Sequence, residues 1–425
     1  MPKNQIPSSV LPSSEGLPPL TGWRKTFAAL RNPNYRYFFT GQTTSLIGTW
    51  ARQSAIGWLA FQLTHSEFLL GLVATLNALP ILLFSTYSGS LADRIPKLLI
   101  FKITSWFSLL SSLLLALLLF HGPVGIGTLL VFSVFWGTAT AFEMPARQSL
   151  MVELVGQKDL INAIALNSAM VNSTRVIGPA IGMQIYALGG DNEIGAAWCF
   201  LIDALSYVGV LYAIGKMKSA PTHVKPAKAD LKYLMEGFHY LKSHSLMART
   251  VALLSIMTLF GWSYLSQLPA FASAHLHLQG RSYGMLWAMS GLGACVAALT
   301  VANLGSKLVN ERSLYAGIGL YCVFVILCGH ETDPIAAALF LFLTGFGLIL
   351  FFSCGNSIIQ TQAPNELRGR LMGIWALVFG GGMPVGSFWM GVVAQRTSSG
   401  VSMQIGGLFC ALGALAVYFF FRKSK

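Results

Sequence analysis

The chain has 425 residues, of which 54% are hydrophobic and 10% are charged, and its formal net charge is +13. This is more apolar sequence than a soluble domain can enclose, and it comes in runs of about 20 residues, the length that crosses the hydrocarbon core of a bilayer. The composition therefore excludes an ordinary soluble domain and predicts a multi-pass membrane protein. The basic residues form no cluster with aromatic support, so no nucleic-acid partner is expected.

Apolar segments follow one another along the chain and predict an all-α membrane protein of twelve transmembrane helices in two pseudo-symmetric six-helix bundles. The expected spans are residues 37–64, 69–91, 98–120, 124–143, 160–187, 195–216, 248–276, 281–304, 312–330, 334–352, 371–396 and 401–421. The expected divisions are an N-terminal tail without a cleavable signal (1–36), a first bundle (37–216), a linker (217–247), a second bundle (248–421) and a short tail (422–425). Within the linker, residues 230–244 are predicted to form an amphipathic helix at the membrane surface.

Charge placement predicts the orientation in the membrane. Most lysines and arginines fall in the termini and the even-numbered loops, whereas Arg281 and Arg396 fall on the other side. Because basic loops stay in the cytoplasm, both termini are predicted to be cytoplasmic. Most of the net positive charge is then a signal of topology.

A compact charged turn at residues 89–97, with the sequence Gly-Ser-Leu-Ala-Asp-Arg-Ile-Pro-Lys, lies between the second and third expected spans. It resembles the loop between helices 2 and 3 of the major facilitator superfamily, although Pro96 stands where that family usually has glycine. The resemblance implies the major facilitator fold and a gating role for Gly89, Asp93 and Arg94. A basic loop that only sets the topology is the alternative interpretation.

Further gating candidates lie at the cytoplasmic end of the fourth span. Glu143 and Arg147 are four residues apart, so they can pair with each other or reach Arg368 and Arg370 of the second half when that side closes. Asp93 is expected near the same two arginines of the second half. A surface pair that contributes little is the alternative for Glu143.

The fifth span contains the sequence Arg-Val-Ile-Gly-Pro-Ala-Ile-Gly at residues 175–182, which is similar to the fifth-helix motif of exporters in the same superfamily. Pro179 removes a backbone hydrogen bond, and Gly178 and Gly182 permit close approach of a neighbouring helix. A kink and close packing between the two halves are therefore expected. The resemblance implies an antiporter, and a generic membrane-helix kink is the alternative.

Arg52, Arg175 and Asp203 lie well inside the first, fifth and sixth spans, at similar depths. A charge in the membrane is costly unless it faces a cavity or a partner. Three interpretations stay open: the arginines bind an anionic substrate, Asp203 carries a coupling proton (a role also considered for Glu143), or the residues form a structural ion pair. Replacing either arginine with alanine is predicted to abolish export of an anion and to leave the protein folded.

Aromatic and uncharged polar side chains offer further contacts for a substrate. The candidates are Asn172, Trp262, Tyr264, Gln267, Asn356 and Gln360. An aromatic cavity suits a catecholate or a macrolide better than a sugar, which requires a denser polar lining. Packing between helices is the equally weighted alternative for the aromatic residues.

Segments at 31–36, 50–52, 145–147, 172–175 and 364–370 resemble the branch of the superfamily that contains siderophore (enterobactin) exporters and macrolide efflux proteins. The resemblance implies a proton-coupled exporter in the bacterial inner membrane that moves an anionic or amphipathic small molecule by alternating access. It implies a monomer without a cofactor, energised by the proton gradient. The alternatives are a broad drug, macrolide or lysophospholipid carrier, a siderophore importer and, more remotely, a receptor that transports nothing.

An enzyme is not expected. The sequence contains no catalytic signature and no nucleotide-binding glycine loop after a strand. Its six cysteines lie in or beside apolar spans without the spacing of a metal or redox motif, so they are predicted to be small buried side chains. The expected partners are a small-molecule substrate and the lipid bilayer, and no metal site is predicted.

Overall fold

The computed structural model describes residues 22–217 and 231–422, and helices without strands make up the secondary structure of this part of the chain. The helices are η1 (Gly22–Arg31), α1 (Pro33–Thr64), α2 (Glu67–Arg94), α3 (Lys97–His121), α4 (Ile126–Leu188), α5 (Glu193–Lys216), α6 (Leu231–Ser243), α7 (Ser245–Ile256), η2 (Met257–Gly261), α8 (Tyr264–Ala270), η3 (Phe271–His275), α9 (Gly280–Leu304), η4 (Gly305–Lys307), α10 (Glu311–His330), α11 (Pro334–Gln362), α12 (Asn365–Arg396) and α13 (Ser399–Arg422). The predicted all-α class is confirmed.

Short polar residues begin several of these helices. Asn32, Ser66, Asn192, Asn310 and Asp333 each accept hydrogen bonds from backbone N–H groups of the first turn. These groups have no partner inside the helix, so a side-chain acceptor stabilises the helix start. The same residues stand directly before or after apolar runs in the sequence, which is why the helix boundaries follow the hydropathy pattern closely.

Ten helical segments of the described chain are long and apolar enough to cross a membrane. The structure differs from the expected spans at α4, which continues through the polar stretch between the fourth and fifth spans and leaves helical geometry only at Gly156, with φ 67°. Positive φ is accessible to glycine without steric cost, so the chain bends there. The more polar α1 and the part of α4 after Gly156 are not among the ten, so the total of twelve spans stays a prediction.

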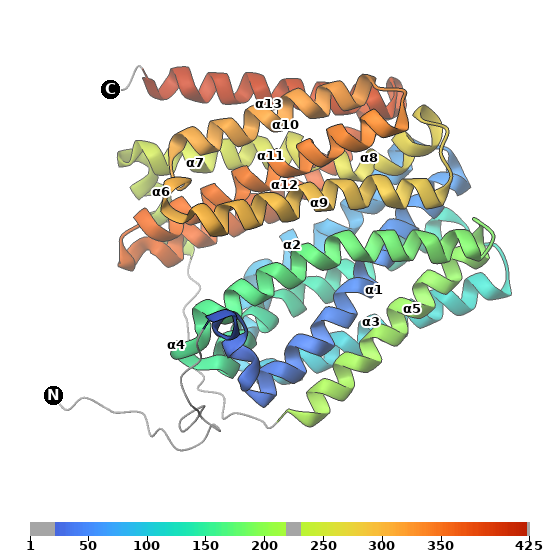
Figure 1. The fold of residues 1–425 in the computed structure, drawn as a ribbon, viewed down its shortest axis with the longest axis horizontal. Helices are drawn as coiled ribbons and strands as arrows, with labels where there is room; N and C mark the ends of the chain where they lie inside the picture. The colour runs from blue at the N-terminus through green and yellow to red at the C-terminus, as the bar shows by residue number, and fades with distance from the viewer. Residues whose placement is uncertain (1–21, 218–230, 423–425) are drawn as a thin grey trace.

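The helices form two halves that lie side by side (Figure 1). Helices α1 to α5 form the first half and α7 to α13 form the second, with α6 at one end of the second. Across the boundary, α2 packs on α12 and α4 packs on α9. The first of these contacts is very close, because a Cβ at Gly71 would lie only 2.8 Å from the Cα of Gly391.

Polar and aromatic contacts join the halves at the end of the bundle away from the basic loops. The Ser66 hydroxyl donates to Oε1 of Gln395 at 2.7 Å. The rings of Trp58 and Tyr283 stack with their centroids 5.0 Å apart. Both pairs link the first half to the second, so they hold this end closed.

Near the basic end, the ion pairs among the described residues connect groups of the same half. Lys97 Nζ lies 2.5 Å from Glu153 Oε1 in the first half, and an Arg370 guanidinium nitrogen lies 2.6 Å from Glu236 Oε2 in the second. The second pair attaches α6 to α12. The described polar contacts between the halves are therefore concentrated at the opposite end.

Closure of that end depends on the glycine contact between α2 and α12. We expect Gly71→Leu to separate the halves there, because its Cβ alone would lie 2.7 Å from the carbonyl oxygen of Ser387. A cysteine introduced at Val73, a buried residue of the same region, should then react faster with a membrane-impermeant maleimide applied from that side. The matched control is Gly127→Leu, because a Cβ at Gly127 meets nothing within 4 Å. Equal labelling rates in both variants would contradict the prediction.

Candidate functional site

The Gly178-Pro179 segment lies in the second part of α4, which stays helical through Pro179. A Cβ at Gly178 would lie 2.5 Å from the Cβ of Trp50, and a Cβ at Gly182 would lie 2.6 Å from the Cβ of Ala51. These glycines therefore permit α1 of the same half to approach, whereas the sequence predicts that they serve the contact between the halves.

The approach of α4 to the second half instead uses glycines of α9. A Cβ at Gly284 would lie 2.5 Å from the Cβ of Met183 and 3.0 Å from the carbonyl oxygen of Pro179. A Cβ at Gly291 would lie 3.0 Å from the carbonyl oxygen of Arg175. Small residues on α9 thus let the two halves meet backbone to backbone beside Arg175.

A cavity of about 260 Å³ lies between the halves, bordered by α1, α2, α4, α8, α9 and α12. Its polar and aromatic lining residues are Thr49, Trp50, Arg52, Gln53, Asn77, Ser133, Thr140, Arg175, Trp262, Ser263, Ser266, Trp287 and Ser387. Two of these are arginines, and no carboxylate is found among the lining residues of the described chain. The cavity is therefore cationic and rich in tryptophan.

Arg52 is paired within the first half. Its Nε lies 2.9 Å from Oδ2 of Asp203, whose side chain is fully buried. The Ser112 hydroxyl donates to the same oxygen at 2.6 Å, and the Trp136 indole donates to Ser112 at 3.1 Å. The Arg52 guanidinium also lies 4.1 Å from the centre of the Trp136 ring. This network compensates the charge of Arg52 and matches the structural ion pair among the three interpretations.

Arg175 has a different environment, although it is equally buried, with 7% of its surface exposed. Its guanidinium carbon lies 4.8 Å from the ring centre of Trp262 and 5.4 Å from that of Trp50. Among the described residues, no carboxylate and no hydrogen-bond acceptor pairs with it. The stacked rings stabilise the cation and leave its N–H donors available to a ligand in the cavity.

Other polar groups of the cavity wall also lack partners. The indole nitrogens of Trp50 and Trp287 and the hydroxyl of Ser263 are buried without a hydrogen bond in the described structure. Buried polar atoms are usually paired, so an unpaired set around a cavity indicates where a ligand or water binds. No local signal in the sequence marks Ser263 or Trp287, because their role depends on which side of each helix faces the cavity.

The predicted substrate contacts divide into two groups. Arg52, Arg175 and Trp262 line the cavity. Outside its lining lie Asn172, bonded to Ser168; Tyr264, bonded to Ser290; Gln267, bonded to the Glu67 carbonyl; and Asn356 and Gln360, bonded to each other. Each residue of this second group thus has a hydrogen-bond partner within the protein, although the Oε1 atom of Gln267 is buried without one in the described structure.

The gating candidates lie near the basic end. Glu143 and Arg147 approach to 3.4 Å on α4. Arg370 pairs with Glu236 of α6 rather than with Glu143. The expected contacts between Glu143 and the arginines of the second half are therefore not formed in this conformation.

The charged segment at residues 89–97 is not a separate turn as the sequence predicts, because residues up to Arg94 continue α2 and only Ile95 and Pro96 separate that helix from α3. Its side chains are described only in part. Arg94 is exposed at the end of α2, and a Cβ at Gly89 would meet nothing within 4 Å. The Asp93 side chain lies outside the described residues. Its predicted approach to Arg368, whose Nε is buried without a hydrogen-bond partner in the described structure, stays a prediction.

Two helical halves around a central cavity, in a chain with many membrane-spanning helices, define a membrane transporter. A family model described as transmembrane secretion effector matches residues 24–424. The chain therefore belongs to this family of the major facilitator superfamily, as the turn at residues 89–97 predicts.

Curated relatives match nearly the whole chain. The staphyloferrin A transporter of Staphylococcus aureus is 24% identical over 398 residues, which cover 92% of this chain and 97% of the relative. The enterobactin exporter EntS of Citrobacter koseri is 26% identical over 412 residues, which cover 92% and 94%. The chain is thus similar in sequence to transporters of two siderophores.

Solved structures support the same fold. A bacterial homolog of the human lysosomal transporter Spinster matches with a TM-score of 0.69 at 15% identity, covering 91% of this chain and 97% of that structure. The nucleoside transporter NupG matches with a TM-score of 0.70 at 12% identity, covering 91% and 99%. These relatives and structures are transporters rather than enzymes, as the sequence predicts.

Proposed function

We propose that the protein is a proton-coupled exporter of an anionic siderophore or a similar oxygen-rich small molecule, and that it works by alternating access in the bacterial inner membrane. The observation that carries this proposal is the position of Arg175, which is buried, unpaired among the described residues and enclosed by Trp50 and Trp262 at the cavity. The names of the siderophore-transporting relatives point to the same class of substrate.

Arg175 suits a carboxylate or catecholate group for a physical reason. A guanidinium offers a planar fork of donors to two oxygens, and a charge-assisted hydrogen bond is stronger in a cavity that excludes water. Trp50 and Trp287 add unpaired indole donors and flat apolar surface beside it. An anion with an aromatic or amphipathic body would use both kinds of contact.

The arrangement of the two halves supports alternating access. The Ser66 and Trp58 contacts close the end away from the basic loops, whereas the described ion pairs near the basic end stay within one half. In an alternating-access carrier, each of the two states has contacts between the halves at one end of the bundle and lacks them at the other end. The reverse state would break these contacts and form new ones between the halves at the basic end.

In antiport of an anion, protonation of the coupling group must weaken binding of the anion. A proton on Asp203 would neutralise the partner of Arg52, release Arg52 toward the cavity and strengthen binding of an anion. Antiport requires the opposite sign, because proton binding must lower the affinity for the substrate. We therefore assign a structural role to Asp203 and the role of proton carrier to Glu143. Glu143 lies about one helical turn beyond Thr140 of the cavity wall and pairs with Arg147, so its protonation would change the gate.

Glu143→Gln is expected to uncouple the carrier. The variant should lose export driven by an imposed pH gradient, because glutamine exchanges no proton, but it should retain exchange of labelled for unlabelled substrate across proteoliposomes. The control is Glu331→Gln, a substitution in the short connection between α10 and α11, outside the cavity wall. Full pH-driven export by the Glu143 variant would eliminate it as the proton carrier.

The substrate class is tested by titrating the purified protein with carboxylate and catecholate siderophores, each iron-free and iron-loaded, and with a neutral macrolide. We expect saturable binding of an anionic siderophore and weaker binding of the macrolide. Tight macrolide binding without siderophore binding would favour the drug-carrier alternative. The direction is tested in cells, where an exporter lowers the retained substrate and an importer raises it.

A further inference from the structure

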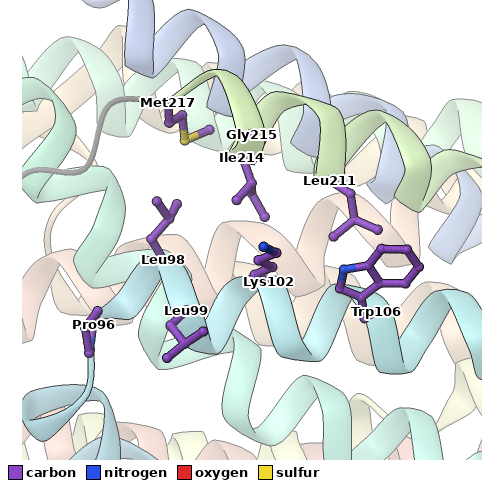
Figure 2. A pocket seen from close by; sticks show the side chains of 9 residues that line it. All are labelled: Pro96, Leu98, Leu99, Lys102, Trp106, Leu211, Ile214, Gly215 and Met217. Atoms are coloured by element: carbon purple, nitrogen blue, oxygen red, sulfur yellow. The ribbon is translucent and has the colours of Figure 1, made fainter.

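A second hollow, of about 370 Å³, lies on the outside of the first half, between the start of α3 and the end of α5. Figure 2 shows Lys102 and Trp106 on α3 facing Ile214 and Leu211 on α5. The hollow shares no lining residue with the central cavity. It is therefore a separate site, and it lies at the basic end of the bundle.

The wall of this hollow belongs to the lipid-facing surface. Along α3, the residues Leu99, Ile103, Trp106, Leu110 and Leu114 recur every three or four positions, and all of them are exposed. Such spacing places them on one face of the helix. An exposed apolar face on a membrane-spanning helix contacts the acyl chains of the bilayer.

Lys102 is the charged residue in this otherwise apolar hollow. Its side chain is exposed, and no carboxylate or hydrogen-bond acceptor of the described residues pairs with it. Two neighbouring basic groups of the described chain are engaged elsewhere, because Lys97 pairs with Glu153 and Lys216 lies over the ring of Tyr212. A cation at a lipid-facing position is costly unless an anion compensates it.

We propose that this hollow binds the headgroup of an anionic phospholipid from the leaflet at the basic end of the bundle. Lys102 lies five residues after the start of α3, about 8 Å along the helix, which corresponds to the boundary between headgroups and acyl chains. Its ammonium group contacts the lipid phosphate. Trp106, one turn deeper on α3, contacts the first part of an acyl chain together with Leu211 on α5.

The charge of the hollow and its place on the lipid-facing surface favour an anionic lipid as the ligand. No acidic residue lines the hollow in the described chain, so a zwitterionic headgroup gains less than an anionic one. A free phosphate would meet a single lysine on an apolar wall, whereas a lipid also covers that wall. The proposal concerns the bilayer alone and does not depend on which solute the central cavity transports.

Trp106 provides a direct reporter for the test. The full-length protein is reconstituted with brominated phosphatidylglycerol or brominated phosphatidylcholine, and quenching of Trp106 is obtained from the difference between the parent protein and Trp106→Phe, since the chain has 10 tryptophans. We expect an apparent preference of about fivefold for phosphatidylglycerol, the contribution of one lysine near an anionic surface.

Four variants, one of them a control, test the assignment. Lys102→Gln should abolish the preference and Lys102→Arg should retain it, while Lys307→Gln, an exposed lysine of the second half, is the control and should also retain it. Gly215→Leu should reduce it by filling the hollow, because a Cβ there meets nothing within 4 Å.

Several results would overturn the proposal. They are equal quenching by the two lipids, an unchanged preference in Lys102→Gln, and loss of the preference when millimolar inorganic phosphate is added, which would indicate a site for a free anion. Absence of quenching by either lipid would also overturn it, because another segment of the protein would then cover Trp106.

Discussion

Arg175→Gln should weaken binding of an anionic substrate about 10- to 100-fold, the effect of losing hydrogen bonds to a charged group. Its export should fall to about 2–20% of the parent rate at substrate concentrations near the dissociation constant of the parent protein, in proportion to the lower occupancy. Glutamine keeps donor capacity and approximate length but removes the charge and the fork. Because no carboxylate of the described chain balances Arg175, the substitution leaves no buried anion behind, and the variant should stay folded.

The measurement is substrate titration of purified protein together with export from proteoliposomes. Arg281→Gln is the matched control, since Arg281 is exposed and outside the cavity lining. Arg175→Lys should retain part of the affinity, because it keeps the charge without the bidentate geometry. If Arg175→Gln bound and exported the anion as the parent protein does, the cationic cavity would not be the substrate site.

Asp203→Ala should destabilise the first half strongly, by about 3–5 kcal/mol, because it leaves Arg52 buried without its partner. Arg52→Ala should have an effect of the same sign, since it leaves the Asp203 carboxylate uncompensated at 0% exposure. The structure therefore changes the expectation for Arg52, whose loss should lower stability as well as transport.

The thermal unfolding midpoint in detergent measures this effect, and a double variant provides the control. Arg52→Met together with Asp203→Leu removes both charges and keeps apolar volume, so it should recover much of the stability lost in either single variant. Additive losses in the double variant would contradict a structural ion pair. Restored stability with unimpaired binding of the anion would assign the substrate contact to Arg175 alone.

The helices themselves could be predicted from the sequence because their signals are local. Apolar runs of membrane-spanning length and capping residues such as Asn32 and Asp333 act within a few positions of the chain. Two polar stretches are exceptions. Residues 89–94, which the sequence predicts as part of a turn, continue α2, and the stretch before Gly156, which it predicts to separate two spans, continues α4. Polarity alone did not distinguish a loop from a helix that extends beyond the membrane.

For the site, the sequence predicted which charged residues matter but not how they pair. Arg52, Arg175 and Asp203 were found because a charge inside an apolar span is conspicuous. The sequence does not predict how they pair, since each residue along a helix turns the side chain by about 100° and the relative rotation of the helices decides which groups meet. For the same reason the sequence predicts Asn356 and Gln360 as substrate contacts, although they bond to each other outside the cavity lining.

The sequence by itself determined the membrane class and the family, because these follow from composition, the length of the apolar runs and local motifs. It also determined the positions of the rare charges inside apolar spans, and it predicts two halves. Only the tertiary structure decided that Asp203 compensates Arg52 while Trp50 and Trp262 enclose Arg175. These contacts join residues 87 to 151 positions apart, and their formation depends on how each helix is rotated and packed against its neighbours.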